Sequence, residues 1–351
     1  MPPDEGADMG VNLSDLVSFT ELDPAQLKGR TVAIDAYNAI YQFLSVIRGP
    51  DGAPLMDGKG RVTSHLAGLL NRNANLIELG LSPVYVFDGI PSRLKSATIR
   101  ERSERRAKAQ EEWKEAVKEG DMQKAYTKAT QSSKLTNEIV ESSRVLLVHL
   151  GIPIVQAPGE GEAQAAYMAA KGDVWSASSQ DFDSFLFGTP RLVRNLTLAG
   201  RRKMPGRNEY RDIKMEVAEL EPTLAAIGLS REQLIDLCIL VGTDFNEGIR
   251  GIGPKKALKL IKEHGTAPRA LASLDKELPE YEEIKGVFLH FEHADEYDLS
   301  LHPPEREKVL DMLVGQYDFG QQRVENALQK MSPPSPKRPE KGNQRSLDSF
   351  F

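Results

Sequence analysis

Cysteine, aromatic residues and long apolar runs are all scarce in this sequence of 351 residues. Its one cysteine, Cys238, cannot form an internal disulfide, which excludes a disulfide-stabilised scaffold and favours a reducing compartment such as the cytoplasm or nucleus. No stretch of about 18 uncharged apolar residues is present, so we expect no membrane-spanning helix. The first ten residues, MPPDEGADMG, also lack the basic and apolar segments of a signal peptide.

The chain carries a small excess of negative charge, but its positive residues are clustered. A net charge of −6 argues weakly against a nucleic-acid partner. A phosphate backbone responds to local charge, however, so the distribution matters more than the sum. Three basic groups stand out: Arg93, Lys95, Arg100, Arg102, Arg105, Arg106 and Lys108; Arg201, Arg202, Lys203 and Arg207; and Lys255, Lys256, Lys259 and Lys262.

Apolar segments that favour strands alternate with helix-favouring segments along much of the chain. Strands are predicted at 31–35, in SPVYVFDG, at 152–156 and at 173–178, with a helix at 160–171. This order indicates an α/β fold with a mostly parallel central sheet flanked by helices.

Other segments depart from this alternation. Residues 93–143 are charged and predict an exposed helical excursion, whereas 191–215 predict a hairpin with basic residues near its turn. From Ser230 the pattern is helical. Residues 332–343, SPPSPKRPEKGN, are rich in proline and charge and predict a disordered linker.

Six acidic residues share one position in this fold, at or just after the C-terminal end of a predicted strand: Asp35, Asp88, Glu160, Glu162, Asp181 and Asp183. These ends border a single crevice in an open parallel sheet, so we expect the acids to converge. Asp244, in the loop after CILVG, is a further candidate. A single acid at such a position is more often a helix cap or a solvated residue. Repetition after four strands favours a shared site.

Several carboxylates in one crevice need a compensating charge. Two unit charges about 4 Å apart cost roughly 4 kcal/mol at an effective dielectric near 20. Divalent cations remove this cost, and hard oxygen ligands favour Mg²⁺ or Mn²⁺. Zinc is disfavoured because the six histidines are scattered and Cys238 lies in an apolar helical pattern. Two such ions can activate a water and stabilise the leaving oxygen of a phosphodiester.

The stretch GIRGIGPKKAL predicts a glycine-rich turn between two helices. Gly251 and Gly253 permit a tight hairpin and close approach of backbone N–H groups to an anion, while Lys255 and Lys256 add positive charge. Such a hairpin contacts DNA phosphates rather than bases, so it binds without reading sequence. An ordinary turn between helices is the alternative.

These motifs closely resemble those of the flap endonuclease family of structure-specific 5′ nucleases. The resemblance runs from about Gly10 to Phe351 and rests on AIDAYNAIYQFL, PVYVFDG, APGEGEAQAAYM, SSQDFDSFLFG, LVGTDF and GIRGIGPKKA, in the family's order. It implies a PIN-like nuclease domain over 1–331, with nuclease parts at about 10–110 and 134–265, a helical arch at about 93–133 and a helix-hairpin-helix module at 231–262. The short tail resembles archaeal members, which implies the cytoplasm; a eukaryotic source would imply the nucleus.

The resemblance also implies roles for individual residues. One Mg²⁺ would be held by Asp35, Asp88, Glu160 and Glu162, and a second would be supported by Asp181, Asp183 and Asp244, with Mn²⁺ able to substitute. Lys95 and Arg102, at the foot of the arch, would stabilise charge on the reacting phosphate. Tyr41 would stack near an unpaired terminal nucleotide. DNA contacts would come from Arg105, Arg106, Gly251, Gly253, Lys255 and Lys256, with K⁺ assisting at the hairpin.

The last eight residues, QRSLDSFF, carry apolar side chains on an otherwise polar tail. Gln344, Leu347, Phe350 and Phe351 are spaced to meet on one helical turn, and exposed aromatics of this kind indicate a partner's pocket. The pattern resembles the motif that binds the DNA sliding clamp, with residues 332–343 as the tether. Apolar residues at a C-terminus by chance are the alternative.

The sequence therefore predicts a monomeric, magnesium-dependent 5′ flap endonuclease with 5′–3′ exonuclease activity, acting on branched double-stranded DNA in replication and repair. Alternatives are a non-catalytic DNA adaptor bound to the clamp, a related 5′ exonuclease or bubble-cutting repair nuclease, and a toxin-like ribonuclease of the same fold. The ribonuclease would lack the glycine hairpin and the aromatic tail, and the bubble-cutting type would carry a long insertion before APGEGEAQ.

Overall fold

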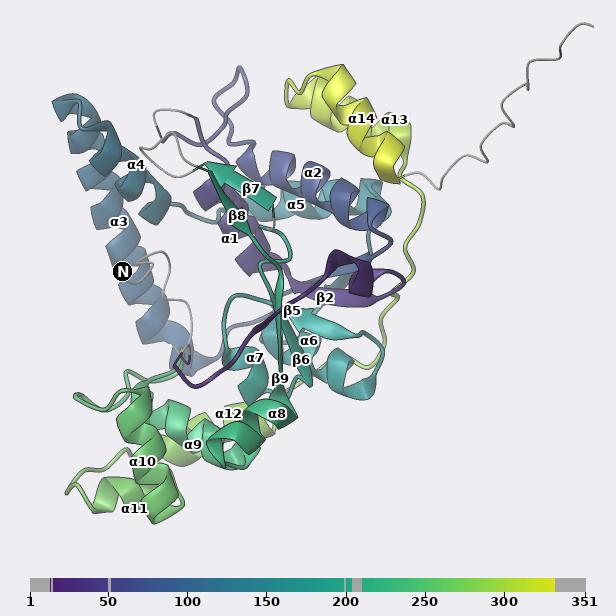
Figure 1. Ribbon diagram of the computed structural model, residues 1–351. Helices are drawn as coiled ribbons and strands as arrows, with labels where there is room; N and C mark the ends of the chain where they lie inside the picture. The colour runs from purple at the N-terminus through teal and green to yellow at the C-terminus, as the bar shows by residue number, and fades with distance from the viewer. Residues whose placement is uncertain (1–12, 14, 50–51, 199, 204–209, 332–351) are drawn as a thin grey trace, which may run out of the picture.

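Seven strands form a central sheet in the computed structural model, which describes residues 13, 15–49, 52–198, 200–203 and 210–331 (Figure 1). Across the sheet the order is β1, β9, β6, β5, β2, β3, β4. Their bounds are β1 Thr20–Glu21, β2 Thr31–Asp35, β3 Ser82–Phe87, β4 Ile154–Gln156, β5 Ser176–Ser178, β6 Arg191–Arg194 and β9 Glu216–Glu219. The five strands from β6 to β4 are parallel, and β9 pairs antiparallel with both β6 and β1.

The direction in which strands are added reverses beside β2. The chain builds outward from β2 to β3 and β4, then returns to the other side of β2 with β5 and β6. Asp35 at the end of β2 is level with Val86 of β3, and Ile34 is level with Ser178 of β5. The carboxyl ends of these strands therefore meet at one edge, and the crevice between β2 and β5 is where such sheets bind ligands.

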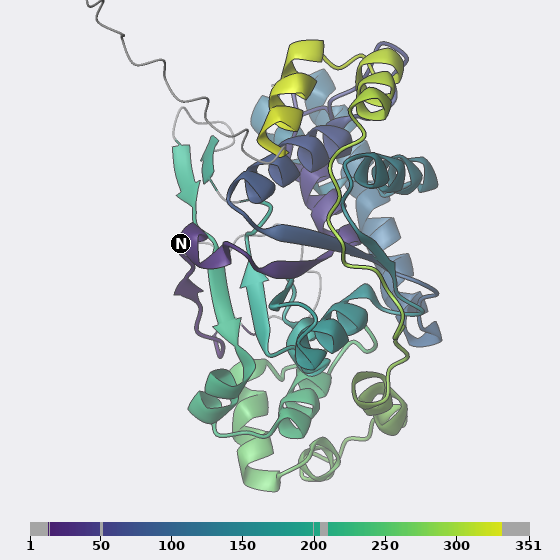
Figure 2. The same cartoon turned by 90° about the vertical axis from the view of Figure 1, so that its right-hand side faces the viewer.

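Alternating side chains of β2 are buried on opposite faces of the sheet. Val32 and Ile34 pack into the core formed with α1, α2, α5, α13 and α14, whereas Ala33 packs against α6. The bounds of these helices are α1 Ala36–Val46, α2 Ser64–Glu78, α5 Asn137–His149, α6 Gly161–Lys171, α13 Arg306–Leu310 and α14 Gln321–Met331. Helices cover both faces (Figures 1 and 2), which explains why β2 and β3 are buried along nearly their whole length.

A second core lies beyond α6 and is built from short helices. Their bounds are α7 Asp183–Leu186, α8 Leu220–Ile227, α9 Arg231–Val241, α10 Pro254–His264, α11 Ala267–Ala272 and α12 Tyr281–Leu289. Helices α9 and α10 with the loop between them form the predicted hairpin module. An extended segment then runs back past α6 to α13 (Figure 2), held where the Gln164 side chain exchanges two hydrogen bonds with the backbone of Ala294.

The charged excursion is a pair of helices that projects from the sheet. Helix α3, Ser96–Glu119, ends at Gly120, whose φ of 76° permits the turn into α4, Met122–Gln131. The returning end, just after α4, is tied to the loop after α1, because the Arg48 guanidinium donates to the Gly52 carbonyl and to Ser133 Oγ. The pair therefore leaves the carboxyl edge of the sheet and returns beside α1 (Figure 1).

Some predicted boundaries are corrected by the structure. The hairpin predicted at 191–215 is wrong for its first part, since Arg191–Arg194 is a strand of the central sheet; the two-stranded hairpin is β7, Gly200–Lys203, with β8, Tyr210–Ile213. Strands β4 and β5 begin two or three residues later than predicted. Within the described ranges no helix is long and apolar enough to cross a membrane. The linker 332–343 and the tail motif 344–351 lie outside the described residues.

Candidate active site

Two acids that follow neighbouring strands each accept a hydrogen bond from a backbone N–H at the start of a helix. Asp35 ends β2, and its Oδ1 accepts a hydrogen bond from the backbone N–H of Asn38, at 2.9 Å, at the start of α1. Asp88 follows β3, and its Oδ1 accepts from the N–H of Gly161, at 2.6 Å, at the start of α6. Asp35 is therefore the N-cap of α1, whereas Asp88 holds the first N–H of α6 from a distant strand end.

The paired glutamates flank Gly161, which leaves room for Asp88. A Cβ placed on Gly161 would lie 2.6 Å from Asp88 Oδ1, so this position excludes any side chain. Glu162 faces the neighbouring loop, where its Oε1 accepts from Ser179 Oγ at 2.8 Å. The glycine between the two glutamates is thus explained by close approach of α6 to the end of β3.

The loop after β5 joins the same group. Asp181 Oδ2 accepts a hydrogen bond from Asn38 Nδ2 at 3.0 Å, which links the end of β5 to the end of β2. Asp183 is buried, with 3 % of its surface exposed, and its charge acts on both Glu162 and Asp181. The predicted convergence of the six acids is therefore observed, and Asp244 joins them from the loop after α9.

Burial and mutual repulsion disfavour the charged forms of these carboxylates. Burial, with the charge of Asp88, raises the pKa of Asp35 to about 7. Burial, with the charge of Glu160, raises the pKa of Asp88 to about 6. Burial and the neighbouring aspartates raise the pKa values of Glu162 and Asp181 well above their ordinary range. The group therefore requires either protons or cations.

Two basic residues from the foot of the arch lie among these acids. Lys95 Nζ pairs with Glu160 and lies 3.3 Å from Asp244 Oδ2. Arg102 pairs with both oxygens of Asp244, at 2.5 and 3.2 Å. Although burial opposes ionisation of Asp244, these two cations hold its pKa below the ordinary value. Asp244 is thus set apart from the other acids by its own compensating charges.

The donor set suits hard divalent cations in chemistry, although the acids are not arranged as a ready cage. Over the ranges that the structure describes, no three carboxylate, histidine or cysteine side chains are placed to hold one ion. Lys95 Nζ instead lies between Glu160 and Asp244. Glu160 Oε1 is buried without a hydrogen-bond partner, which leaves one carboxylate oxygen available to a cation. Carboxylate oxygens of this kind fit Mg²⁺ or Mn²⁺.

Of the arch residues predicted to contact DNA, one meets Tyr41. The Arg106 guanidinium lies 4.9 Å from the centre of the Tyr41 ring, which is 8 % exposed on α1. Arg105 points elsewhere: its side chain is 69 % exposed and pairs with Glu101 one turn away. The structure therefore joins α1 to the arch through Tyr41 and Arg106 and leaves Arg105 on the surface.

In the hairpin between α9 and α10, the backbone conformation favours glycine at one position but not at the other. Gly251 has a φ of 83°, in the left-handed region, whereas Gly253 has a φ of −97° that other residues adopt. Lys255 pairs with Asp15 at 3.0 Å, and Lys256 Nζ donates to the Gly251 carbonyl at 3.3 Å. The exposed face of α10 is basic beyond the hairpin, with Lys259 and Lys262 lining a shallow depression.

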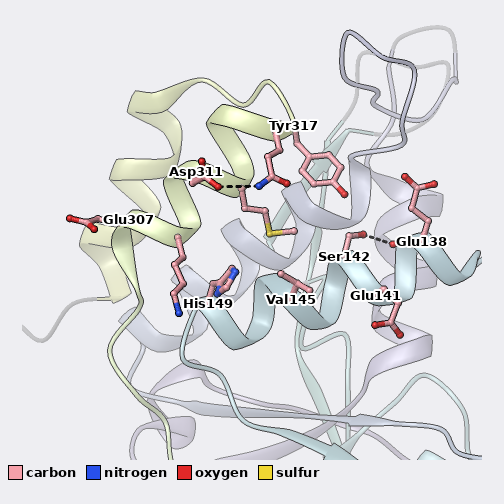
Figure 3. A pocket seen from close by; sticks show the side chains of 11 residues that line it. Glu138, Glu141, Ser142, Val145, His149, Glu307, Asp311 and Tyr317 are labelled. Atoms are coloured by element: carbon pink, nitrogen blue, oxygen red, sulfur yellow. Dashed lines mark hydrogen bonds between the residues drawn. The ribbon is translucent and has the colours of Figure 1, made fainter.

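A surface groove of about 570 Å³ lies between α5 and α13 and contains none of the predicted site residues (Figure 3). Val145 and Met312 contribute its apolar lining, and Glu138, Glu141 and Glu307 its acidic rim. Size therefore does not identify the reactive site here. The acids at the carboxyl edge of the sheet are the candidate reactive site because they converge there and their pKa values are shifted.

Sequence reasoning missed the neutral residues that hold the acids. Asn38 and Ser179 hydrogen-bond Asp181 and Glu162, and Gln156 Nε2 donates to the Asp88 carbonyl at 2.8 Å. Asn38 had one available signal: it lies three residues after Asp35, on the same side of α1. The partners of Ser179 and Gln156 are distant in sequence, so local spacing gave no indication of them.

The sheet is mostly parallel, with buried acids at the point where the strand order reverses. Basic side chains lie among these acids and a basic helical hairpin lies nearby. This combination is typical of an α/β nuclease. The XPG N-terminal domain matches residues 9–109 and the XPG I-region matches residues 151–244. Flap endonuclease 1 of Archaeoglobus fulgidus is 48% identical over 344 residues, covering 98% of this chain and all of that protein. Flap endonuclease 1 of Aeropyrum pernix is 47% identical over 350 residues, with the same coverage.

Solved structures agree with the sequence relatives. The flap endonuclease-1 from Methanococcus jannaschii superposes with a TM-score of 0.73 at 41% identity, covering 92% of this chain and 98% of that one. The catalytic core of Rad2 in complex with DNA substrate has a TM-score of 0.66 at 22% identity, which shows the shared fold. The chain belongs to the flap endonuclease family. It is a structure-specific 5′ flap endonuclease, a hydrolase of DNA, and the adaptor alternative is not favoured.

Proposed function

We propose that the chain hydrolyses phosphodiesters at the base of 5′ flaps by a two-metal mechanism, acting in the maturation of lagging-strand (Okazaki) fragments and in repair. The observation that carries this is the meeting of seven acids from four strand ends and the hairpin module at one buried edge. Metal dependence is general in this family, and Mg²⁺ with Mn²⁺ as a substitute is the choice that the oxygen donors support.

The acids divide into two groups according to their position. Asp35, Asp88, Glu160 and Glu162 would hold one ion, and Asp181 and Asp183 with Asp244 would support the second. Bound divalent ions supply two effects: a lower pKa for a water near the phosphate, and stabilisation of the leaving oxygen. Without them, mutual repulsion and burial hold these carboxyl groups partly protonated near neutral pH.

The chain's own cations would act on the phosphate. Lys95 and Arg102 are anchored to Glu160 and Asp244, so their charged groups already lie at the edge where a scissile phosphate must come. Entry of metal ions and a phosphate would release them from the acids and make the phosphate oxygens their new partners. Donors held in place in this way stabilise charge that develops during P–O cleavage.

The helical pair α3 and α4 would form the arch that admits the single-stranded flap. Its foot is joined to the hairpin module, because Thr98 Oγ1 donates to the Asp244 carbonyl at 2.9 Å. Tyr41 would stack on an unpaired nucleotide, beside Arg106. The exposed Arg105 would contact the flap backbone. The arch and the module that binds duplex DNA would thus be positioned together.

The hairpin between α9 and α10 would hold the duplex away from the cut. Gly251 and Gly253 would let backbone N–H groups approach a phosphate, Lys255 and Lys256 would add charge, and K⁺ would bind to backbone carbonyls of the hairpin. The C-terminal motif would bind the DNA sliding clamp through Gln344, Leu347, Phe350 and Phe351. Residues 332–343 would then tether the nuclease, as a monomer, to the clamp.

Substitution of Asp181 tests the metal assignment directly. Asp181→Ala is expected to lower cleavage of a 5′-flap duplex in Mg²⁺ by at least about 10³-fold while leaving binding of the same DNA in EDTA within threefold of the parent. Retained turnover would contradict the assignment. A comparison of flap, nicked and single-stranded substrates separates the flap endonuclease from a 5′ exonuclease, because the exonuclease would cut the nicked duplex at least as fast.

A further inference from the structure

A chain of hydrogen-bonded neutral side chains leads from Asp181 into the protein. Asn38 Nδ2 donates to Asp181 Oδ2 at 3.0 Å. Gln42 Nε2 donates to Asn38 Oδ1 at 2.5 Å, from one turn further along α1. Thr197 Oγ1 donates to Gln42 Oε1 at 2.9 Å, from the segment after β6. Asn38 and Thr197 are each 4 % exposed, so protein groups rather than solvent set their orientation.

The direction of these hydrogen bonds follows from the carboxylate at one end. Asp181 in the ionised form that would bind a cation can only accept, so Asn38 then presents its NH₂ group to Asp181 and its oxygen to Gln42. Gln42 must then present its own NH₂ group to Asn38 and its oxygen to Thr197. The threonine hydroxyl closes the chain as a donor. Each amide therefore has one orientation, although an isolated amide could rotate by half a turn.

Asn38 also holds the acid on the neighbouring strand. Its backbone N–H donates to Asp35 Oδ1 at 2.9 Å, while its side chain donates to Asp181. One residue thus connects the end of β2 to the loop after β5, across the reversal point of the sheet. It does so without adding charge, whereas Lys95 and Arg102 compete with metal ions as cations. One oxygen of each aspartate is occupied by this residue.

We infer that Asn38 is a positioning residue that sets the spacing of Asp35 and Asp181 for divalent cations, and that Gln42 and Thr197 fix the orientation of its amide. The inference rests on the proposed assignment of these two aspartates as cation ligands. Removal of groups that orient metal ligands typically weakens metal binding by about 10- to 100-fold. Thr197 touches neither aspartate through any hydrogen bond in the described structure, so an effect there must pass along the chain.

Binding of Mn²⁺ to the full chain without DNA tests the inference, with free Mn²⁺ measured by electron paramagnetic resonance. We expect Asn38→Ala to weaken Mn²⁺ binding by roughly 10-fold or more, and Gln42→Leu and Thr197→Val to weaken it by about threefold or more. Thr223→Val is the matched control: Thr223 is 6 % exposed, and its hydroxyl donates to the carbonyl of Glu219, the residue just before α8. It should bind Mn²⁺ within about twofold of the parent.

The outcomes separate this inference from the proposed function. Asp181→Ala that binds Mn²⁺ as the parent does would overturn the metal assignment itself. If Asp181→Ala weakens Mn²⁺ binding but Asn38→Ala and Thr197→Val do not, the positioning role fails while the metal assignment stands. If Asn38→Ala is unfolded, as judged by circular dichroism, the Mn²⁺ affinities of Thr197→Val and Thr223→Val are compared instead. Equal affinities of these two variants would overturn the inference. Binding of flap DNA in EDTA should be unchanged in Thr197→Val.

Discussion

Arg102 of α3 and Asp244 of the loop after α9 form a two-pronged ion pair, with contacts of 2.5 and 3.2 Å, that fastens the foot of the arch to the hairpin module. Lys95 shares the same carboxylate at 3.3 Å. The pair is only partly exposed, so solvent screens it less than a surface pair. It connects the helical pair that we propose admits a flap to the hairpin module that we propose holds duplex DNA.

Removal of this guanidinium is expected to impair catalysis more than folding. Arg102→Ala should lower the single-turnover rate on a 5′-flap duplex by about 10²-fold, because a donor to the reacting phosphate is lost. Arg102→Lys should restore little, since one ammonium group cannot pair with two oxygens in a fixed plane. Arg306→Ala is the control, as it removes an exposed pair with Glu325 on the far helices. A rate for Arg102→Ala within threefold of the parent would refute the role.

Stability in the absence of metal should depend on pH with a predictable sign. The pKa values of Asp35 and Asp88 are raised from 3.8 to about 7 and about 6, so the folded state binds protons more tightly than the unfolded state. Their contribution to stability is fully present below about pH 4 and is lost as pH rises through 6 and 7. Added Mg²⁺ should replace the lost protons.

Thermal unfolding with and without EDTA measures this exchange. At pH 8, millimolar Mg²⁺ should raise the melting temperature by roughly 5 °C, as expected for a ligand well above its dissociation constant. At pH 5 the gain should be less than half as large, because protonated carboxyl groups do not bind the ion. Asp181→Asn should lose most of the gain at pH 8. Equal gains at both pH values would show that the raised pKa values are not linked to the ion.

The two glycines of the hairpin should respond differently to alanine. Gly251→Ala should destabilise the fold by about 1 kcal/mol, since its φ of 83° is strained for a side chain. Gly253→Ala should melt as the parent does, because its φ is ordinary and no atom lies within 4 Å of the added methyl. If the backbone here approaches a phosphate, Gly253→Ala should nonetheless weaken duplex binding in EDTA. Gly286→Ala on α12 is the control, because an added methyl group there also meets no atom within 4 Å. If Gly253→Ala binds duplex DNA as tightly as this control, the phosphate contact is contradicted.

The lysines at the start of α10 should act through salt-dependent phosphate contacts. Lys255→Ala and Lys256→Ala should weaken duplex binding without sequence preference and lower the slope of log affinity against log salt by about one each. Lys276→Ala, in the exposed turn after α11, is the control for a lost surface charge. An unchanged salt slope in both α10 variants would place the duplex elsewhere.

The C-terminal motif should behave as a small set of apolar anchors. Phe350→Ala and Phe351→Ala are each expected to weaken binding of the sliding clamp by at least about tenfold, because buried aromatic side chains dominate such contacts. Calorimetric titration of the clamp with the full chain measures this directly. Ser346→Ala lies in the same tail but outside the spaced set, and it should bind within twofold of the parent. Loss of affinity in all three variants would point to the tail as a whole rather than to its aromatic residues.

The sequence by itself predicted the alternation of strands and helices that brings the acids together. Asp35, Asp88 and Asp181 each follow an apolar strand, and parallel strands place their carboxyl ends at one edge whatever the details of packing. It also predicted the kind of cofactor, since carboxylate oxygens with no histidine cluster favour hard cations. The glycine hairpin and its lysines could also be predicted, because local spacing alone specifies a turn and its charge.

Only the tertiary structure decided how these groups are compensated and oriented. Lys95 and Arg102 meet Asp244 across more than a hundred residues, and Asn38 meets Asp181 at a sequence separation of 143. Such contacts depend on how the helices pack against the sheet. The periodicity of apolar residues in the sequence predicts helices and strands but not this packing. The close approach of Gly161 to Asp88, which leaves no room for a side chain, is another contact that only the tertiary structure shows. Spacing along the chain predicted the acids of the proposed site, and packing between distant segments determines which side chains hold them.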